Sequence, residues 1–299
     1  MEQITEIGFV GLGHMGGNMA ARFLAAGYTV HGEERTREHA QDLVHEGLLW
    51  HDTPREVAEA AEVLFTSVPD DDVLESVASG PDGILVGLAA PKIWVDMSTI
   101  SPRKSRELAK RASARGARML DAPASGSVPQ VQTGTLTIMV GGDPQAYTRA
   151  EPLLRELGSP THIGENGQGL VLKLAINISL AVQMLALSEG LLLAERAGID
   201  PKLALDVMTT SPIGSPMLKA RADLVLDLPD EAWFDISLMH KDVALALDTG
   251  RELRVPLPSA AAADMMLTVA QAAGYERRDI AALFEVLAHL ASNPVDAPA

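Results

Sequence analysis

The chain has 299 residues and carries 24 lysines and arginines against 40 aspartates and glutamates, so its formal net charge is −16. This acidity argues against nucleic acid or an anionic membrane as the main partner, because both would repel the chain. The absence of cysteine excludes disulfides, thiolate metal sites and a cysteine nucleophile, and the 47% apolar residues exclude a disordered acidic chain.

Short apolar runs alternate with amphipathic stretches through the first half of the chain. Alternating strands and helices are typical of βαβ units in a mainly parallel sheet. The strands lack polar alternation, so we expect helices on both faces of the sheet. The pattern predicts strands at residues 4–12, 29–32, 63–68, 92–96, 118–121 and 135–140, and helices at residues 15–26, 37–46, 71–79 and 102–115.

Strand signals nearly vanish after about residue 165. The predicted fold class is α/β, with a Rossmann-type domain at residues 1–165 joined by a long helix to an all-helical domain at residues 166–292. The Pro- and Ala-rich tail at residues 293–299 is expected to be flexible. The long helix is expected at residues 169–196, and further helices at 202–209, 215–226, 236–251, 259–273 and 278–289.

No targeting or membrane-spanning segment is expected. The N-terminus lacks a basic region. The stretch at residues 176–194 is mostly apolar, but Asn177, Gln183 and Glu189 interrupt it, and a spanning helix needs about 20 predominantly apolar residues. We therefore expect a soluble, cytoplasmic protein with no membrane partner.

The motif G-x-G-x-x-G occupies Gly11, Gly13 and Gly16, after the first strand and before the first helix. In a Rossmann domain the first glycine permits a tight turn, the second lets backbone N–H groups approach a pyrophosphate, and the third allows close helix–strand packing. The helix N-terminus adds a positive dipole end. The alternative is a glycine-rich turn that binds no nucleotide. We expect a bound dinucleotide, contacted also by the intervening residues Leu12, His14 and Met15.

The segment Glu34-Arg35-Thr36 follows the second strand, where the residue that reads the cofactor ribose is expected. Glu34 would accept hydrogen bonds from the 2′-hydroxyl of NAD and repel the 2′-phosphate of NADP. Arg35 beside the hydroxyl of Thr36 favours that phosphate. Because both signals are present, the sequence leaves NAD(H) and NADP(H) open.

Four motifs, in order along the chain, carry a resemblance to a known family. They are Gly8-Phe9-Val10-Gly11-Leu12-Gly13-His14-Met15-Gly16; Asp121-Ala122-Pro123-Ala124-Ser125-Gly126-Ser127 with its continuation at residues 134–142; Gly169-Leu170-Val171-Leu172-Lys173-Leu174-Ala175-Ile176-Asn177; and Lys241-Asp242. The chain resembles the β-hydroxyacid dehydrogenase family, which includes 3-hydroxyisobutyrate dehydrogenase and short-chain semialdehyde reductases. The resemblance implies NAD(P)-dependent oxidation of a 3-hydroxy acid, or reduction of its semialdehyde, and a helical domain that often dimerises.

The resemblance also implies roles for individual residues. Where the family usually has glycine this chain has Ser127, and Pro129-Gln130 replaces a smaller pair, which bears on substrate choice. Glu34 replaces the usual Asn or Asp, which bears on cofactor choice. By motif, Lys173 would be catalytic, Ser125, Gly126, Asn177 and Lys241 would contact the substrate, and Val68, Pro69, Thr99 and Lys241 would line the cofactor.

Lys173 and Asn177 are the residue types that this chemistry needs. Hydride transfer at a carbinol carbon requires a proton carrier on the oxygen. A partly buried lysine can supply that proton, because desolvation lowers its pKa. Asn177 is four residues further on and lies on the same helical face. The alternative for Lys173 is a solvated surface lysine, which its apolar flanks make costly.

Two other assignments have plain alternatives. Ser125 and Gly126 follow a strand end, where a hydroxyl and exposed N–H groups can bind a carboxylate, but an ordinary Ser-Gly turn has the same sequence. One interpretation has Lys241 approach the substrate while Asp242 pairs locally, and the other is a surface ion pair between the two.

Two rival functions remain at this stage. One is an imine or ketone reductase on the same scaffold, although the related imine reductases generally lack the lysine. The other is a catalytically silent dinucleotide-binding module. The eight histidines show no metal-binding spacing, so no metal is expected. The expected partners are a small carboxylate-bearing substrate and further copies of the chain, as a homodimer or higher homo-oligomer.

Overall fold

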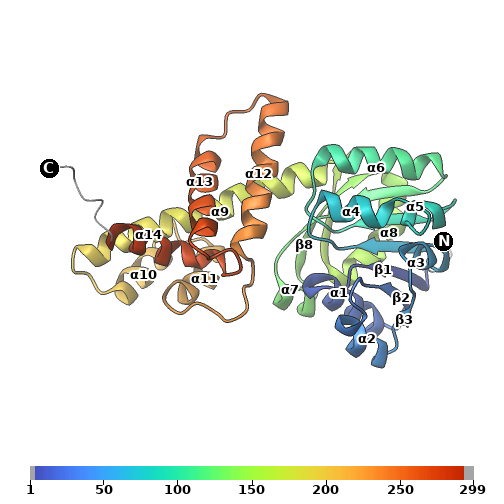
Figure 1. Ribbon diagram of the computed structural model, residues 1–299, viewed down its shortest axis with the longest axis horizontal. Coiled ribbons are helices and arrows are strands. Elements are labelled where there is room, and N and C mark those ends of the chain that lie inside the picture. The colour runs from blue at the N-terminus through green and yellow to red at the C-terminus, as the bar shows by residue number, and fades with distance from the viewer. Residues whose placement is uncertain (1–3, 293–299) are drawn as a thin grey trace. The chain divides into compact units, whose positions relative to one another are not determined.

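The computed structural model describes residues 4–292. This part of the chain divides into two compact units, and the division falls between Lys173 and Leu174. Unit 1 is the α/β part and unit 2 is the helical part (Figure 1). The predicted tail at residues 293–299 lies outside the described residues.

The strands of unit 1 form one sheet in the order β3-β2-β1-β4-β5-β6-β8-β7, with β9 against β8. The first six strands in this order are parallel, and β8 runs antiparallel to β6 and β7. The order reverses direction between β1 and β4, and open α/β sheets bind ligands outside the carboxyl ends of the strands at such a point. The strands are β1 (Glu6–Val10), β2 (Thr29–Glu33), β3 (Leu49–Trp50), β4 (Val63–Thr66), β5 (Ile93–Asp96), β6 (Arg118–Asp121), β7 (Ala124–Ser125), β8 (Leu136–Gly142) and β9 (Gly158–Gly164).

Helices cover both faces of the sheet. Residues of α1, α2 and α8 share one buried cluster with Ile7, Phe9 and Phe65, and residues of α3 to α6 share another with Val10 and Trp94. Figure 1 shows α4, α5 and α6 on one side of the sheet and α1 and α2 on the other. The helices are α1 (His14–Ala25), the 3₁₀ turn η1 (Arg37–Ala40), α2 (Gln41–His45), α3 (Pro54–Ala60), α4 (Asp71–Ala78), α5 (Ile84–Gly87), α6 (Pro102–Ala114), α7 (Val128–Thr133) and α8 (Pro144–Leu157).

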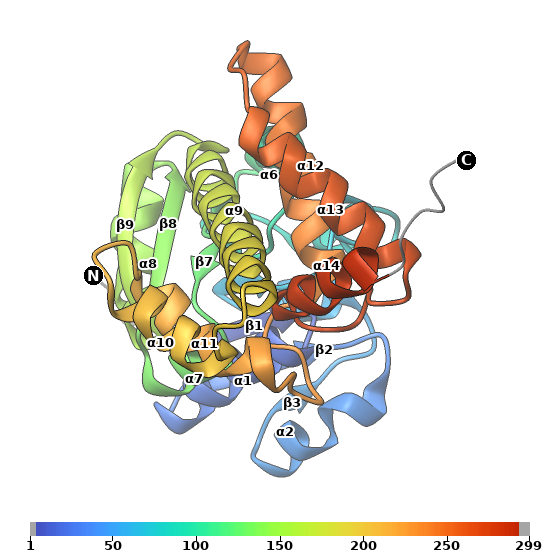
Figure 2. The ribbon, with the colours of Figure 1, turned by 90° about the vertical axis from the view of Figure 1, so that its left-hand side faces the viewer.

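Unit 2 is built from helices around a second apolar core, with α12 and α13 side by side (Figure 2). A buried ion pair at 2.6 Å joins Arg221 to Asp279. Asp279 also accepts backbone hydrogen bonds from Trp233 and Phe234, so both of its oxygens are satisfied. The helices are α9 (Gln168–Arg196, which begins in unit 1), α10 (Pro201–Thr210), α11 (Pro216–Leu226), α12 (Ile236–Leu253), α13 (Pro258–Ala272), the 3₁₀ turn η2 (Ile280–Ala282) and α14 (Leu283–Ser292).

The predicted fold class is confirmed, with differences in detail. The helix expected at residues 37–46 is split into η1 and α2, and the one at 278–289 into η2 and α14. The strand expected at 135–140 is β8, which runs against the parallel direction. The sequence patterns missed β3, β7, β9, α3, α5, α7 and α8.

The expectation that no stretch has the length of a membrane span is wrong for α9. By length and composition alone, this 29-residue helix could cross a membrane, and 39% of its most apolar stretch is buried within the chain. Core helices of soluble proteins have the same composition, so the finding raises the question of what covers the remaining apolar surface.

Candidate active site

Two glycines in the β1–α1 loop are required by the fold. Gly11 has a φ of +88°, and a Cβ atom there would collide with the backbone oxygen of Ser67. A Cβ atom on Gly16 would collide with the backbone oxygen of Gly11. The two glycines let the chain turn tightly and let α1 pack closely on the end of β1.

Gly13 differs from both, because apart from its own chain neighbours no described atom lies within 4 Å of its Cβ position. Gly13 is the N-cap residue of α1, where no side chain caps the helix and the first turn carries no acidic residue. The backbone N–H groups at His14 and Met15 and the positive end of the helix therefore remain available to an external anion. This geometry fits the pyrophosphate of a dinucleotide.

Two glutamates at the end of β2 hold the glycine loop in place. The backbone oxygen of Glu33 accepts a hydrogen bond from Gly11 N at 3.0 Å, and the carboxylate of Glu34 accepts one from Leu12 N at 2.7 Å. Burial, and then the charge of Glu34, raise the pKa of the Glu33 carboxyl to about 7. The candidate ribose-reading acid thus also anchors the loop, while Arg35 is exposed beside it.

A buried network at the ends of β4 and β5 holds the segment that begins at Val68. Oδ1 of Asp96 accepts hydrogen bonds from the hydroxyls of Thr66 and Ser98, both at 2.7 Å, and Ser98 Oγ accepts one from Val68 N at 2.9 Å. Burial is the main reason that the pKa of Asp96 is raised to about 7. Sequence reasoning missed Asp96, whose signal was a carboxyl group ending an apolar strand, just before Ser98-Thr99.

Ser125 and Gly126 lie at a turn that only glycine can make. Ser125 ends β7 and pairs with Thr137 of the antiparallel strand β8. Gly126 has a φ of +136°, and its Cβ would lie 2.7 Å from Leu136 Cδ2. The turn presents a hydroxyl next to a backbone in a conformation that L-residues rarely adopt.

The unusual Ser127 and Gln130 interact with each other. Oε1 of Gln130 accepts hydrogen bonds from the backbone N of Ser127 at 2.9 Å and from its hydroxyl at 3.0 Å. The pair forms a capping box at the start of α7. The departure from the family pattern at these positions therefore has a local structural reason.

Lys173 and Asn177 are both buried on α9. The exposed fraction is 9% for Lys173 and 1% for Asn177. Nδ2 of Asn177 donates to Oδ2 of Asp242 at 2.5 Å. Oδ1 of Asp242 lies 3.0 Å from Nζ of Lys241. Within unit 2, the buried carboxylate of Asp242 thus contacts both Asn177 and Lys241, two residues that the sequence assigned to the substrate.

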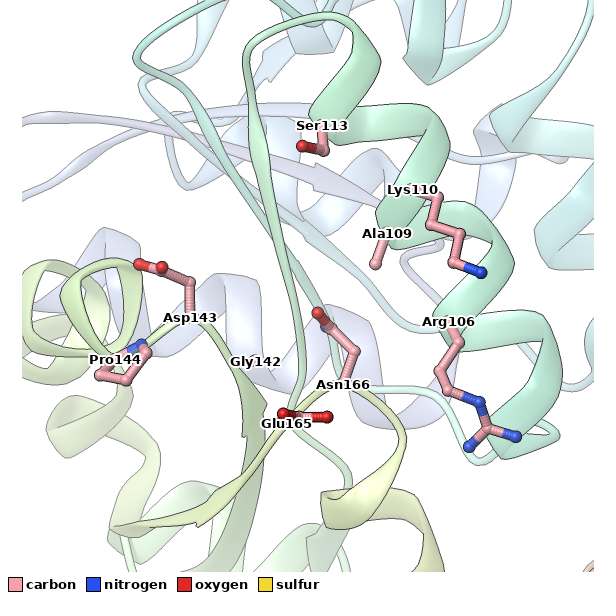
Figure 3. Close-up of a pocket in the computed structure, with 9 residues that line it drawn as sticks. All are labelled: Arg106, Ala109, Lys110, Ser113, Gly142, Asp143, Pro144, Glu165 and Asn166. Carbon is pink, nitrogen blue, oxygen red and sulfur yellow. The ribbon is translucent and has the colours of Figure 1, made fainter.

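A cavity of about 440 Å³ opens in unit 1, and none of the residues that the sequence assigned to the site lines it (Figure 3). In Figure 3, Arg106 and Lys110 extend from α6, and Asp143, Glu165 and Asn166 come from the opposite wall. The remaining lining residues are Ala109, Ser113, Gly142 and Pro144.

The aspartates at residues 70–72 stabilise the N-terminus of α4 and its surroundings. Asp70 accepts a hydrogen bond from Val73 N at 2.8 Å and caps α4, and Asp71 accepts one from Ser101 N at 2.7 Å. Within residues 4–292, no three His, Asp or Glu side chains gather in a way that could hold a metal ion.

Comparison with known proteins agrees with this architecture. Residues 6–167 match the family described as the NAD binding domain of 6-phosphogluconate dehydrogenase. Residues 167–287 match the family described as NAD-binding of NADP-dependent 3-hydroxyisobutyrate dehydrogenase. The chain is 34% identical over 288 residues to 2-(hydroxymethyl)glutarate dehydrogenase of Eubacterium barkeri, covering 96% of each chain. The chain belongs to the β-hydroxyacid dehydrogenase family.

Solved structures extend this result. The structure of Psf3 in complex with NADP+ and 2-OPP has a TM-score of 0.85 and 30% identity, covering 94% of this chain and 99% of that chain. An imine reductase from Pseudomonas sp. has a TM-score of 0.65 and 27% identity, covering 95% of this chain and 100% of that chain. Family membership makes the protein an oxidoreductase that uses NAD(H) or NADP(H) and acts on hydroxyl groups.

Proposed function

We propose that the protein interconverts a small 3-hydroxy acid and its semialdehyde with NAD(P), and that Lys173 is the general acid/base. The observation that carries this proposal is the burial of Lys173 on α9, at 9% exposure and with apolar neighbours in sequence. Removing an ammonium group from water is costly, so a buried lysine is retained where its charge or proton is used.

The cofactor is proposed to bind across the carboxyl ends of β1, β2 and β4. The N-terminus of α1 would hold the pyrophosphate over Gly13, and Glu34, Arg35 and Thr36 would meet the adenine ribose. Val68, Pro69 and Thr99 would line the nicotinamide side of this site. The bound cofactor supplies the hydride acceptor or donor, and the protein supplies alignment and proton transfer.

Lys173 would give its Nζ proton to the carbonyl oxygen during reduction and take the hydroxyl proton during oxidation. Asn177 would orient the same oxygen, because its amide is held at Nδ2 by Asp242. Ser125 and the backbone at Gly126 would bind the substrate carboxylate. Lys241, paired with Asp242, would add a second cation near the substrate.

The substitution Lys173→Ala tests the catalytic role. We expect turnover to fall by about 10²- to 10⁴-fold, the usual contribution of a general acid or base, with nearly unchanged affinity for NAD(P)H. Stopped-flow turnover and nicotinamide fluorescence titration measure the two quantities. Near-normal turnover in this variant would remove Lys173 from the mechanism.

Identifying the substrate class requires an activity panel that is run with both NAD(H) and NADP(H). It would contain 3-hydroxyisobutyrate, 2-(hydroxymethyl)glutarate, short semialdehydes and cyclic imines, followed at the nicotinamide absorbance band. The likeness to an imine reductase makes imine or ketone reduction the second candidate. Reduction of imines with no turnover of hydroxy acids would favour it, and tight cofactor binding without any turnover would favour a silent module.

The protein is proposed to be a cytoplasmic homodimer or higher homo-oligomer, with no nucleic-acid or membrane partner. Support comes from exposed apolar side chains in the helical unit, among them Leu193, Leu203 and Val207, each more than half exposed. Large apolar side chains that gather into one exposed surface usually mark a contact with another molecule. Sedimentation velocity measures the assembly, and a monomer at micromolar concentration would contradict it.

A further inference from the structure

The carboxylate of Asp121 lies at the N-terminus of α9. It accepts hydrogen bonds from the backbone N–H groups of Gly167 at 2.7 Å and Leu170 at 3.2 Å. It also accepts one from the hydroxyl of Ser105 on α6 at 3.3 Å. Asp121 is fully buried at the end of β6. One carboxylate therefore ties the central sheet to the helical turn just before Lys173.

Two glycines pack so closely around this carboxylate that no side chain fits. A Cβ atom on Gly141 of β8 would lie 2.7 Å from Oδ2 of Asp121, and one on Gly169 of α9 would lie 2.9 Å from the same oxygen. The Gly169 Cβ would also collide with the backbone oxygen of Met139. The second and third motifs of the family thus meet at one buried carboxylate.

We propose that Asp121 is a positioning residue for Lys173: it fixes the first turn of α9 and sets the electrostatic potential at which the lysine exchanges its proton. This inference rests on the catalytic role proposed for Lys173. Its basis is that the N–H groups in the first turn of a helix carry a partial positive charge. A carboxylate bonded to two of them neutralises the end of the helix on which the lysine is mounted.

Two charged side chains lie next to this anchor. Asp96 is the register neighbour of Asp121 on β5, and its pKa is raised to about 7 by burial and, to a smaller extent, by the charge of Asp121. A guanidinium nitrogen of Arg106 lies 2.8 Å from where a Cβ on Gly167 would stand. Burial also raises the pKa of Asp121, but the backbone hydrogen bonds oppose that rise. The hydrogen bonds from Gly167 and Leu170 thus favour the carboxylate form of Asp121 against the effect of burial.

The test compares Asp121→Asn with Asp143→Asn in the full-length protein. Asp143 is a matched control, because it caps α8 through the N–H groups of Gln145 and Ala146. Amide hydrogen exchange, the affinity for NAD(P)H and the pH profile of kcat would be measured for both variants and for the wild type.

In Asp121→Asn we expect faster amide exchange at Gly167 and Leu170 and unchanged affinity for NAD(P)H. We also expect a fall in kcat of about 100-fold, the cost of a misplacement near 1 Å. The limb of the pH profile that reports the catalytic proton should move to lower pH, because removing a negative charge disfavours the ammonium. Asp143→Asn should speed exchange only at α8 and leave kcat and its pH profile unchanged.

A purely structural role would give a different outcome. If the limb in Asp121→Asn stays at the wild-type pH, or if Asp143→Asn lowers kcat equally, the proposal is wrong. If Lys173→Ala is inactive but the pH profile of Asp121→Asn is the same as that of the wild type, only this inference is wrong. If Lys173→Ala is active, the proposed function itself is wrong. If Asp121→Asn does not fold, Ser105→Ala removes one hydrogen bond to the same carboxylate, and we expect faster amide exchange at Gly167 and Leu170 and a smaller fall in kcat. Unchanged exchange and unchanged kcat in Ser105→Ala would also refute the proposal.

Discussion

The N-termini of α1 and α9 both contain a glycine that has no room for a side chain, Gly16 in one and Gly169 in the other. At α1 the N-cap residue is Gly13, with open space where a side chain would stand and no capping side chain. At α9 the carboxylate of Asp121 already binds the N–H groups of the first turn. The positive N-terminus of α1 is therefore left open, whereas that of α9 is neutralised by a carboxylate of the chain itself.

This contrast shows what turns a helix N-terminus into a binding site. Every helix has unpaired N–H groups and a positive end, so these features do not distinguish α1 from α9. The difference is whether the chain provides its own anion. We therefore expect α1 to bind the cofactor and α9 to hold a catalytic side chain. Adding a carboxylate at the N-terminus of α1 should weaken cofactor binding, and disturbing the carboxylate at the N-terminus of α9 should impair catalysis.

The largest effect is expected from Gly13→Asp, which gives α1 an internal carboxylate like that of α9. Gly13 has φ −65° and open space at its Cβ position, so aspartate fits without strain. Like charges a few ångströms apart repel by several kcal/mol in a partly buried site, so the Kd for NAD(P)H should rise about 100-fold or more. The Tm should stay the same or rise slightly, because aspartate is a good N-cap. Fluorescence titration and thermal unfolding measure both.

A matched Gly13→Ala variant separates charge from bulk. Alanine adds a methyl group but no anion, so its effect on the Kd should be much smaller than that of aspartate. Equal losses in the two variants, or an unchanged Kd in Gly13→Asp, would mean that the open N-terminus of α1 is not where the cofactor phosphates bind.

The second effect is expected from Gly169→Ala at the filled N-terminus. Replacing a helical glycine by alanine ordinarily stabilises a protein by about 1 kcal/mol. Here the added methyl would meet backbone and the Asp121 carboxylate, so we expect a loss of roughly 1–3 kcal/mol and a fall in kcat of about 10-fold or more. Denaturant unfolding and steady-state kinetics measure these quantities.

Gly190→Ala is the control on the same helix. A Cβ atom there would meet only the flexible end of Met208, so stability should be unchanged or improved and kcat should be preserved. If Gly169→Ala behaves like Gly190→Ala, the packing around Asp121 does not constrain α9.

The sequence patterns predicted the alternation in unit 1 and the helices of unit 2, because both are periodic in apolar residues. They missed β9 and β3 for different physical reasons. The strand β9 (Gly158–Gly164) contains Gly, Pro, Thr and His instead of an apolar run, and β3 has two residues at a sheet edge. The antiparallel direction of β8 was also hidden, because an apolar run reports burial and not direction.

The candidate site could be proposed from the sequence where its residues are neighbours along the chain, as in the glycine loop and the segment around Lys173. It was not predictable where contacts join distant positions. Asp242 binds Asn177 across 65 residues, and Asp121 binds Gly167 across 46. Such pairs depend on the tertiary fold, and an aspartate after an apolar strand has no periodic signature of its own.

The smallest effect concerns Glu33, one of the two carboxyl groups near the open N-terminus of α1. Its pKa is raised to about 7 by burial and by Glu34, so it is mostly neutral below pH 7 and negatively charged above it. The added charge opposes an anionic cofactor, and opposes NADP, with its extra phosphate, more than NAD. The same titration lowers the stability of the fold as pH rises from about 4.5 to about 7, because only the unfolded chain ionises freely in that range.

We therefore expect the affinity for NADP(H) to fall several-fold between pH 6 and pH 8, with a smaller fall for NAD(H). Glu33→Gln should abolish the difference between the two pH dependences, since a carboxamide does not titrate. Glu46→Gln, an exposed glutamate at the end of α2, should leave the difference in place. Titrations with both cofactors at several pH values measure how each Kd depends on pH. If NADP(H) and NAD(H) show the same pH dependence in the wild type, or if Glu33→Gln leaves the difference between them unchanged, the charge of Glu33 does not control cofactor binding at the N-terminus of α1.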